Sequence, residues 1–303
     1  MAQPRFSGVL APVITPFQVD LTPDSALLAK HCQWLVSQGA GLAVFGTNSE
    51  ANSLSLPEKR QLLDSLCEQG IATTHLMPGT GACALTDAVE LTAHAVALGC
   101  RGVLMLPPFY YKGVSDDGLF AFYAEVIERV ADEKLQIYLY HIPPISQVPI
   151  NFDLIERLAA AYPANIAGIK DSSGDWNNTL QLNQLGIEDF RVFCGSESFL
   201  LQNMQNGGAG CISATANVNP AAIHDLYANW QDSDAGQKQA QLNQIRDIFQ
   251  SFPMIAALKA ATAQYAEESA WLRVRPPLVP LSKQELEKLT QQLQDAGFQM
   301  PDI

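Results

Sequence analysis

Residues 137–170 read IYLYHIPPISQVPINFDLIERLAAAYPANIAGIK, and this stretch decides the fold class. Two short apolar runs, Ile137–Tyr140 and Ile166–Ile169, predict buried β-strands. The segment between them predicts a helix that begins after Asn151 and ends at Pro163, because proline cannot continue a helix. A strand, a helix and a second strand in succession are typical of a parallel α/β sheet.

The same pattern recurs along the first three quarters of the chain. Further strands are predicted at Val9–Ile14, Leu42–Phe45, His75–Met77, Val103–Leu106, Arg191–Cys194 and Cys211–Ser213. Helix-length segments lie between them, with start signals at Ser55 and at Thr86 and closing glycines at Gly70 and Gly99. Eight such units in sequence, with no GxGxxG after the first strand, favour a (β/α)8 TIM barrel over an open sheet.

The strand pattern stops at about Gln231. The remaining chain predicts three helices, at Gln237–Gln250, Pro253–Ala266 and Ser282–Asp295. We therefore expect two parts, a barrel over residues 1–231 that carries the active site and a C-terminal helical extension over residues 232–303 packed beside it.

Composition and charge exclude several classes of protein. The 303 residues are 48% apolar, and 18 Lys and Arg against 31 Asp and Glu give a net charge of −13. A surface that acidic repels nucleic acid and anionic membranes, and no apolar run is long enough for a membrane span. Met1–Phe17 lacks the apolar core of a signal peptide, so we expect a cytoplasmic protein. The six cysteines form no CxxC pair and the five histidines no HExxH motif, so neither disulfides nor a metal site are expected.

Polar residues at strand ends are the candidates for chemistry, because a barrel carries its active site at the carboxyl ends of its strands. Lys170 ends one strand directly and is either a Schiff-base nucleophile or a lysine that extends to solvent. Tyr140 ends the preceding strand and is either a proton shuttle or a core aromatic. Thr47 lies in a glycine-led turn whose amides suit a carboxylate, and Tyr110 and Tyr111 lie on a long loop.

These strand-end residues and the motifs around them resemble those of a known family. The sequence is similar to the dihydrodipicolinate synthase and N-acetylneuraminate lyase family, the pyruvate-type class I aldolases. The resemblance extends over nearly the whole chain and includes Ala11–Phe17, Pro78–Ala82 and Gly210–Val218. It implies a Schiff-base lyase that cleaves or condenses a 2-oxo acid with pyruvate. It also implies a homotetramer built from two tight dimers, with no metal and no organic cofactor.

The resemblance assigns roles to individual residues. It implies that Lys170 is the nucleophile, with Tyr140 and the Thr47 hydroxyl as its proton relay. It further implies that a loop tyrosine reaches the neighbouring subunit's site. Counting from Pro108 gives Tyr110 and counting back from Gly118 gives Tyr111, and we take Tyr110 as the candidate. Backbone groups near Gly195 and Ile212 are implied to line the substrate pocket.

Two departures from the family pattern bear on the substrate. Asn48 and Ser49 replace a hydroxyl residue and a glycine in the Gly46–Glu50 turn. Ile145 stands where the resembling synthases carry a carboxylate-binding arginine. The neutral Ser146 beside it suits a hydroxylated acceptor, so we expect poor turnover of aspartate semialdehyde. The alternatives are dihydrodipicolinate synthase proper, a 2-oxo-3-deoxy acid dehydratase or deaminase, and an oxo-acid-binding barrel without turnover.

Overall fold

The computed structural model describes residues 4–303, and the first three residues of the predicted barrel part lie outside it. The strands of the described chain are β1 Gly8–Ala11, β2 Gly41–Leu42, β3 Val103–Met105, β4 Ile137–His141, β5 Ile166–Asp171, β6 Arg191–Cys194 and β7 Gly210–Ile212. Its α-helices are α1 Ser25–Ser37, α2 Leu56–Glu68, α3 Leu85–Ala97, α4 Asp116–Val130, α5 Pro143–Ser146, α6 Phe152–Ala161, α7 Trp176–Asn183, α8 Leu200–Gln205, α9 Pro220–Ala228, α10 Ala235–Gln250, α11 Met254–Tyr265 and α12 Lys283–Asp295. Its 3-10 helices are η1 Ala51–Ser53, η2 Thr73–His75, η3 Glu197–Phe199, η4 Ala214–Asn217 and η5 Ser269–Leu272.

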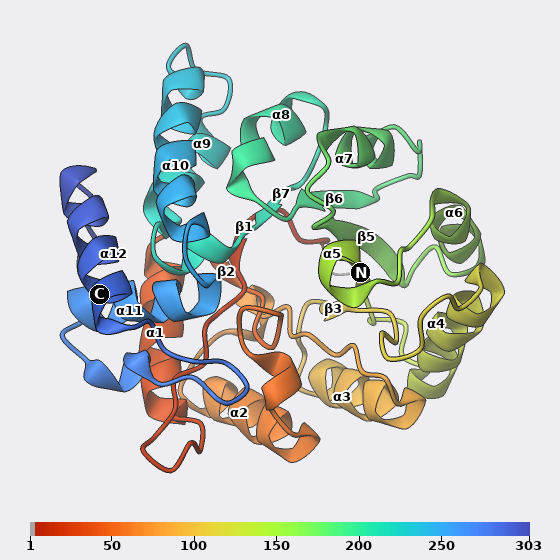
Figure 1. Cartoon of the computed structure of the whole chain (residues 1–303). Coiled ribbons are helices and arrows are strands. Elements are labelled where there is room, and N and C mark those ends of the chain that lie inside the picture. The colour runs from red at the N-terminus through yellow and green to blue at the C-terminus, as the bar shows by residue number, and fades with distance from the viewer. Residues whose placement is uncertain (1–3) are drawn as a thin grey trace.

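The strands form one curled parallel sheet in the order β2-β1-β7-β6-β5-β4-β3. Figure 1 shows these strands at the centre of the molecule with helices arranged around them. Parallel neighbours need long crossover connections, and the helices between successive strands supply them. The predicted α/β class, with a curled parallel sheet inside a layer of helices, is confirmed.

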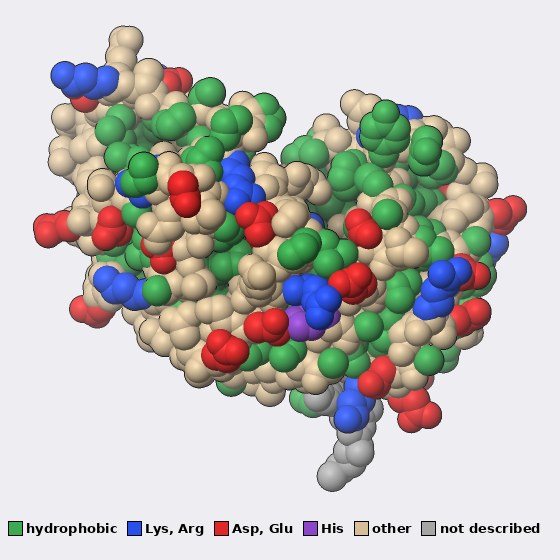
Figure 2. Space-filling view, turned by 90° about the horizontal axis from the view of Figure 1, so that it is seen from below, with side chains coloured by type: hydrophobic (Ala, Val, Ile, Leu, Met, Phe, Trp, Pro, Cys, Tyr) green, Lys and Arg blue, Asp and Glu red, His purple; other side chains and the backbone are tan. Residues whose placement is uncertain are grey.

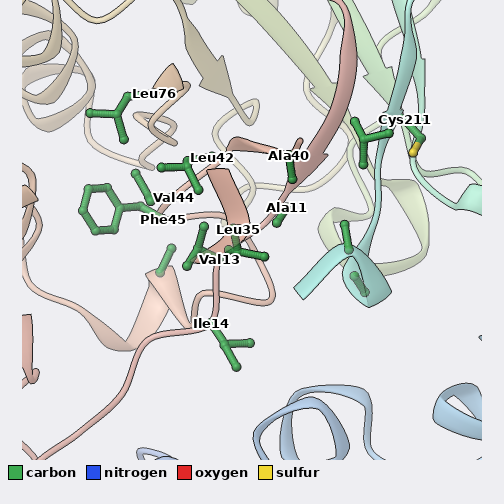
Figure 3. Packing of buried hydrophobic residues seen from close by; sticks show 14 of the residues in the cluster. Ala11, Val13, Ile14, Leu35, Ala40, Leu42, Val44, Phe45, Leu76 and Cys211 are labelled. Atoms are coloured by element: carbon green, nitrogen blue, oxygen red, sulfur yellow. The ribbon is translucent and has the colours of Figure 1, made fainter. Parts of the chain in front are cut away.

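The segment predicted as the third strand, His75–Met77, pairs differently from the others. Its first residue still belongs to η2, so the extended chain begins one residue later. Leu76 of this segment makes an isolated parallel bridge with Leu42, and Gly79, two residues beyond the segment, makes another with Leu104. Leu42 and Leu76 lie close to one another in the core (Figure 3). This segment therefore lies between β2 and β3, the two edge strands of the sheet.

Alternation along the strands separates an inner core from an outer one. In β4, Ile137 and Leu139 belong to the cluster that packs against the helices. Tyr138 and Tyr140 belong to a second cluster, made mostly of inward-facing strand residues. Because side chains alternate with a period of two, the register that pairs Tyr140 with Lys170 also directs Lys170 into the curled sheet.

Helix ends follow local signals at most positions. Ser55 and Glu58 form the reciprocal capping box that begins α2, and Gly70 follows the helix with φ +85°. The prediction that Thr86 begins the next helix is wrong. That helix, α3, begins at Leu85 after Ala84, which has no side-chain oxygen to cap it.

The C-terminal helices lie together on one side of the sheet (Figure 1). Helix α10 packs against η3, α8 and α9, whereas α11 contacts η4 and η5. Helix α12 packs against both α10 and α11. The predicted C-terminal helices are thus present, and α10 brings part of the sequence after residue 231 to the carboxyl ends of β6 and β7.

The surface agrees with the acidic composition. Figure 2 shows acidic and basic side chains scattered over one face, with no broad basic patch there. No helix within residues 4–303 is long and apolar enough to cross a membrane. All six cysteines are free, and four of them are buried, as expected for small apolar side chains.

Candidate active site

A cavity of about 580 Å³ lies at the carboxyl ends of the central strands. Its lining residues are Thr47, Asn48, Tyr140, Ile142, Pro144, Ile145, Lys170–Gly174, Gly195, Ser196, Ser198, Phe199, Ala214, Arg246, Asp247, Gln250 and Met254. A larger cavity of about 850 Å³ lies between α1 and η5 and contains no strand-end residue. The smaller cavity is the candidate site because the carboxyl ends of parallel strands meet there.

Lys170 lies at the centre of this site. Its side chain comes from the penultimate position of β5, and only 2% of the residue is exposed. Its Nζ lies 4.2 Å from the centre of the Tyr140 ring. Within residues 4–303 no carboxylate forms an ion pair with it. A lysine amine attacks a carbonyl carbon as a nucleophile, and a buried Nζ without an acidic partner in the described chain has no ion pair to give up before it does so.

The Tyr140 hydroxyl connects the lysine to the turn after β2. Its oxygen lies 3.1 Å from Oγ1 of Thr47, within hydrogen-bond distance. In the same turn the Gly46 amide donates to Oγ of Ser49 at 3.1 Å. The amides of Thr47 and Asn48 donate no hydrogen bond to any part of the described chain, so they are available to a carboxylate in the cavity.

The glycine that the family carries at Ser49 is not needed for the backbone of this turn. The residue with a left-handed conformation is Glu50, with φ +56°, whereas Ser49 keeps a negative φ. The Ser49 side chain is fully buried, and its carbonyl accepts a hydrogen bond from Thr15 at 2.7 Å. Serine therefore fits here, and its hydroxyl holds the turn closed.

Glu50 attaches the turn to the C-terminal helices. Its carboxylate forms an ion pair with Lys259 of α11, and both side chains are completely buried. The Arg275 amide donates to the second carboxylate oxygen at 2.9 Å. Burial lowers the pKa of Lys259 to about 8, although Glu50 opposes this shift. The ammonium is thus still charged at neutral pH, and the pair fixes the end of the turn that carries Thr47.

The ends of β5 and β6 approach each other closely beside Lys170. The Gly195 amide donates to the Asp171 carbonyl at 2.7 Å. A Cβ on Gly195 would lie 2.1 Å from Oγ of Ser172, so only glycine fits at this position. The Asp171 carboxylate accepts hydrogen bonds from Ser173 and, at 2.6 Å, from Thr179. Its charge is therefore satisfied within the chain.

Arg246 is the residue of this cavity that the sequence analysis missed. It lies on α10, and its Nη1 donates to Glu197 at 3.2 Å and to Ser213 at 3.0 Å. Lys112, on the loop between β3 and α4, uses its Nζ to donate to the carbonyls of Phe109 and Ser146. No spacing signal marks Arg246, because which face of a C-terminal helix meets the barrel depends on long-range packing.

The structure does not bring every candidate into the cavity. Ser146 is buried, and its hydroxyl is hydrogen-bonded to the carbonyls of Ile142 and Val148 rather than aimed at the cavity. Ile212 is a fully buried residue of β7 and does not line the cavity. Tyr110 is 74% exposed and contacts Tyr111, with ring centres 5.4 Å apart. Within one subunit this tyrosine takes no part in the cavity.

Comparison with known proteins gives consistent results. A family model described as the dihydrodipicolinate synthetase family matches residues 5–296. An uncharacterized DapA-like lyase of Chloroflexus aurantiacus is 32% identical over 95% of this chain and 96% of its own. The crystal structure of dihydrodipicolinate synthase from Agrobacterium tumefaciens is similar with TM-score 0.88, at 30% identity over 95% of this chain and 99% of that one. YagE, a prophage protein of Escherichia coli K12 solved in complex with pyruvate, has TM-score 0.88 and 26% identity over 97% and 99%.

Proposed function

The chain belongs to the dihydrodipicolinate synthetase family, and on this premise we propose that it cleaves or condenses a 2-oxo acid with pyruvate through a Schiff base on Lys170. The expected family and the expectation of an enzyme within it are confirmed by the family match and by relatives named as lyases and synthases. The observation that carries the proposed chemistry is the buried Lys170 amine, without an acidic partner in the described chain, in a cavity at the strand ends.

Schiff-base formation requires two proton transfers next to the amine. Nζ of Lys170 attacks the 2-oxo carbon, and the carbonyl oxygen leaves as water while the protonated C=N bond forms. In the cleavage direction, the hydroxyl on carbon 4 loses its proton and the carbon 3–carbon 4 electron pair moves into the iminium. This releases an aldehyde and leaves an enamine. Protonation of carbon 3 and hydrolysis of the imine then release pyruvate.

Tyr140 and Thr47 are the groups that would carry these protons. The Tyr140 ring contacts Nζ and its hydroxyl lies 3.1 Å from Thr47, so one chain of hydroxyls leads away from the reacting atoms. The amides of Thr47 and Asn48, unpaired in the described chain, would hold the substrate's 1-carboxylate, and Gly195 would keep the end of β6 packed against Ser172 beside the substrate. These arrangements support the roles that we propose for all four residues.

The finer architecture is part of the same proposal. The bridges of Leu76 and Gly79 support an eighth position in the sheet, and hence a closed (β/α)8 barrel over residues 1–231 with residues 232–303 as a helical extension. We propose a cytoplasmic homotetramer of two tight dimers. The exposed Tyr110 supports this assembly, because it would complete the proton relay in a neighbouring subunit's site.

Borohydride reduction in the presence of pyruvate tests the covalent step. We expect one lysine, Lys170, to gain the mass of a reduced pyruvate adduct, as seen by peptide mapping. Lys170→Arg should fold but lose both trapping and turnover, because a guanidinium stays protonated. Lys283→Arg is the matched control, since the side chain of Lys283 is 91% exposed. Unmodified Lys170 under conditions that trap another class I aldolase would refute the mechanism.

A panel of 2-oxo-3-deoxy acids distinguishes the reaction types that share this intermediate. Release of pyruvate identifies a lyase, whereas loss of water without carbon–carbon cleavage identifies a dehydratase. Condensation of pyruvate with aspartate semialdehyde, at an efficiency above that of every other aldehyde tested, hydroxylated or carboxylated, would identify a synthase.

A further inference from the structure

The charged side chains that line the cavity differ in how many of their hydrogen-bonding groups are already paired within the chain. In the proposed function, Nζ of Lys170 forms the imine with the substrate. The Asp171 carboxylate is satisfied by Ser173 and Thr179. Of the remaining lining residues, only Arg246 is a cation. Asp247, the other charged lining residue, is a carboxylate, so Arg246 is the lining side chain that can pair with a second anionic group on the substrate.

Arg246 is held in place before any substrate binds. Its Nη1 bonds to Glu197 and Ser213, and its Nε donates to Gln250 at 3.3 Å. Glu197 is 1% exposed, and its carboxylate also accepts from the hydroxyls of Ser213 and Thr215. The guanidinium is thus oriented by a buried carboxylate whose other bonds are already made.

One edge of this guanidinium remains available to a ligand. Nη2 makes no hydrogen bond to any residue from 4 to 303, whereas Nη1 makes two. Arg246 is only 13% exposed at its side chain, so the free edge belongs to the cavity rather than to open solvent. A partly desolvated guanidinium edge matches a carboxylate well, because its N–H groups form a planar fork.

Two anion-binding groups therefore enter the cavity from different elements. The free amides of Thr47 and Asn48 follow β2, and Arg246 projects from α10 beside the ends of β6 and β7. Lys170 comes from β5. A substrate whose 2-oxo carbon is on Lys170, and whose first carboxylate is on the turn, would extend its other end toward α10.

We propose that Arg246 binds a second carboxylate at the far end of the substrate. The preferred substrate class is then a 2-oxo acid with two terminal carboxylates, or the carboxylated aldehyde that forms it with pyruvate. This inference rests on the proposed function and names its substrate class. It replaces the expectation of a neutral acceptor, which considered only Ile145 and its neighbours. Ile145 cannot donate a hydrogen bond, but Arg246 supplies that contact from α10, a helix that follows it by about a hundred residues.

Three aldehydes of the same carbon skeleton test the proposal. Pyruvate is condensed with tartronate semialdehyde, which ends in a carboxylate, with glyceraldehyde, which ends in a hydroxymethyl group, and with glyceraldehyde 3-phosphate. We expect kcat/KM for the carboxylated aldehyde to exceed that for glyceraldehyde at least tenfold. In Arg246→Gln this preference should disappear, with the ratio of the two kcat/KM values falling to about one through a higher KM for the carboxylated aldehyde.

Two further variants separate charge recognition from loss of structure. Arg246→Gln leaves Glu197 buried without its cation, so Arg246→Gln/Glu197→Gln removes both charges and should show the same loss of preference. Arg246→Lys should keep part of the preference because it keeps the charge. Arg157→Gln is the matched control, since Arg157 pairs with Asp117 on the surface, and it should behave as the wild type.

Borohydride trapping of pyruvate is measured on every variant. Trapping on Lys170 with an unchanged carboxylate preference in Arg246→Gln and in Arg246→Gln/Glu197→Gln would overturn this inference and leave the proposed function standing. A preference for the phosphate that depends on Arg246, without one for the carboxylate, would likewise overturn it. Absence of trapping in the wild type would refute the proposed function, and the inference with it.

Discussion

Replacing Lys259 by methionine should destabilise the protein strongly, because the change leaves a buried carboxylate without its cation. Glu50 and Lys259 are both completely buried, and Lys259 also donates to the Arg273 carbonyl at 2.7 Å. Methionine has a similar length and fills the space beside the Phe17 ring, over which Nζ now lies at 4.5 Å. The variant therefore removes the charge with little change in packing.

The magnitude follows from the burial of the pair. Removing one partner of a buried ion pair costs about 3–5 kcal/mol, since the other charge stays desolvated. Among residues 4–303, Glu50 would then keep only the Arg275 amide as a donor, at 2.9 Å, which is too little to balance a buried carboxylate. For 303 residues, an unfolding entropy of about 2.1 cal/mol/K per residue converts this cost into a fall in Tm of about 5–8 °C.

The assay compares thermal unfolding of the wild type, Lys259→Met and Glu50→Gln/Lys259→Met. The double variant should recover most of the lost Tm, because it leaves no buried charge unpaired. Below the unfolding transition, the single variant should also show a raised KM for pyruvate, since Glu50 closes the turn that carries Thr47. The matched surface control is Lys283→Met, whose lysine is 91% exposed and pairs only with Glu287 at 3.9 Å.

A Tm for Lys259→Met within 1–2 °C of the wild type would refute this reasoning about buried charge. A double variant that is no more stable than the single one would do the same. In that case the loss would come from the packing of the side chain rather than from an unpaired carboxylate.

Two further predictions concern assembly and pH. Mixing Lys170→Ala and Tyr110→Phe chains under conditions that exchange subunits should restore part of the activity, because each mixed dimer holds one site with both residues intact. Absence of recovery in verified mixed dimers would contradict a cross-subunit role for Tyr110. Burial between Trp34 and Trp271 lowers the pKa of His31 to about 3, so the folded protein holds this histidine neutral where the unfolded chain protonates it. Its contribution to stability is complete above about pH 6.5 and is lost as the pH falls toward 3, by about 2 kcal/mol at pH 5. Urea unfolding at pH 7 and pH 5 should therefore show a smaller loss for His31→Phe than for the wild type, and equal losses would contradict the assignment.

Much of the fold could be predicted from local sequence. Strand and helix alternation in residues 137–170 is visible as a change of apolar period, and the Ser55–Glu58 capping box lies within four residues. The start of α3 was missed because Ala84 carries no capping oxygen. The pairing of the segment after His75 could not be predicted in the same way. Isolated bridges involve single residues, so the sequence there shows no alternating run of apolar side chains.

The sequence alone determined the candidates Lys170, Tyr140 and Thr47. Each follows or ends an apolar run, and parallel strands in one sheet all point their carboxyl ends the same way, so position along the chain already implies a shared site. The 4.2 Å contact from the lysine to the tyrosine ring follows from the register of the neighbouring strands β4 and β5. The 3.1 Å contact from Tyr140 to Thr47 joins the ends of β4 and β2, which are not paired, and therefore also requires the sheet to curl.

Only the tertiary structure decided which other residues join them. Arg246 and Lys259 lie on helices whose sequence is compatible with several docking faces, and the packing of α10 and α11 against η3 and η4 selects the faces that reach the site. Ser146 was predicted from sequence to bind substrate, but its hydroxyl is hydrogen-bonded to the backbone carbonyls of Ile142 and Val148 instead. Local patterns encode backbone conformation, whereas burying charged groups in pairs depends on contacts between segments far apart in the chain, and no short stretch of sequence records those contacts.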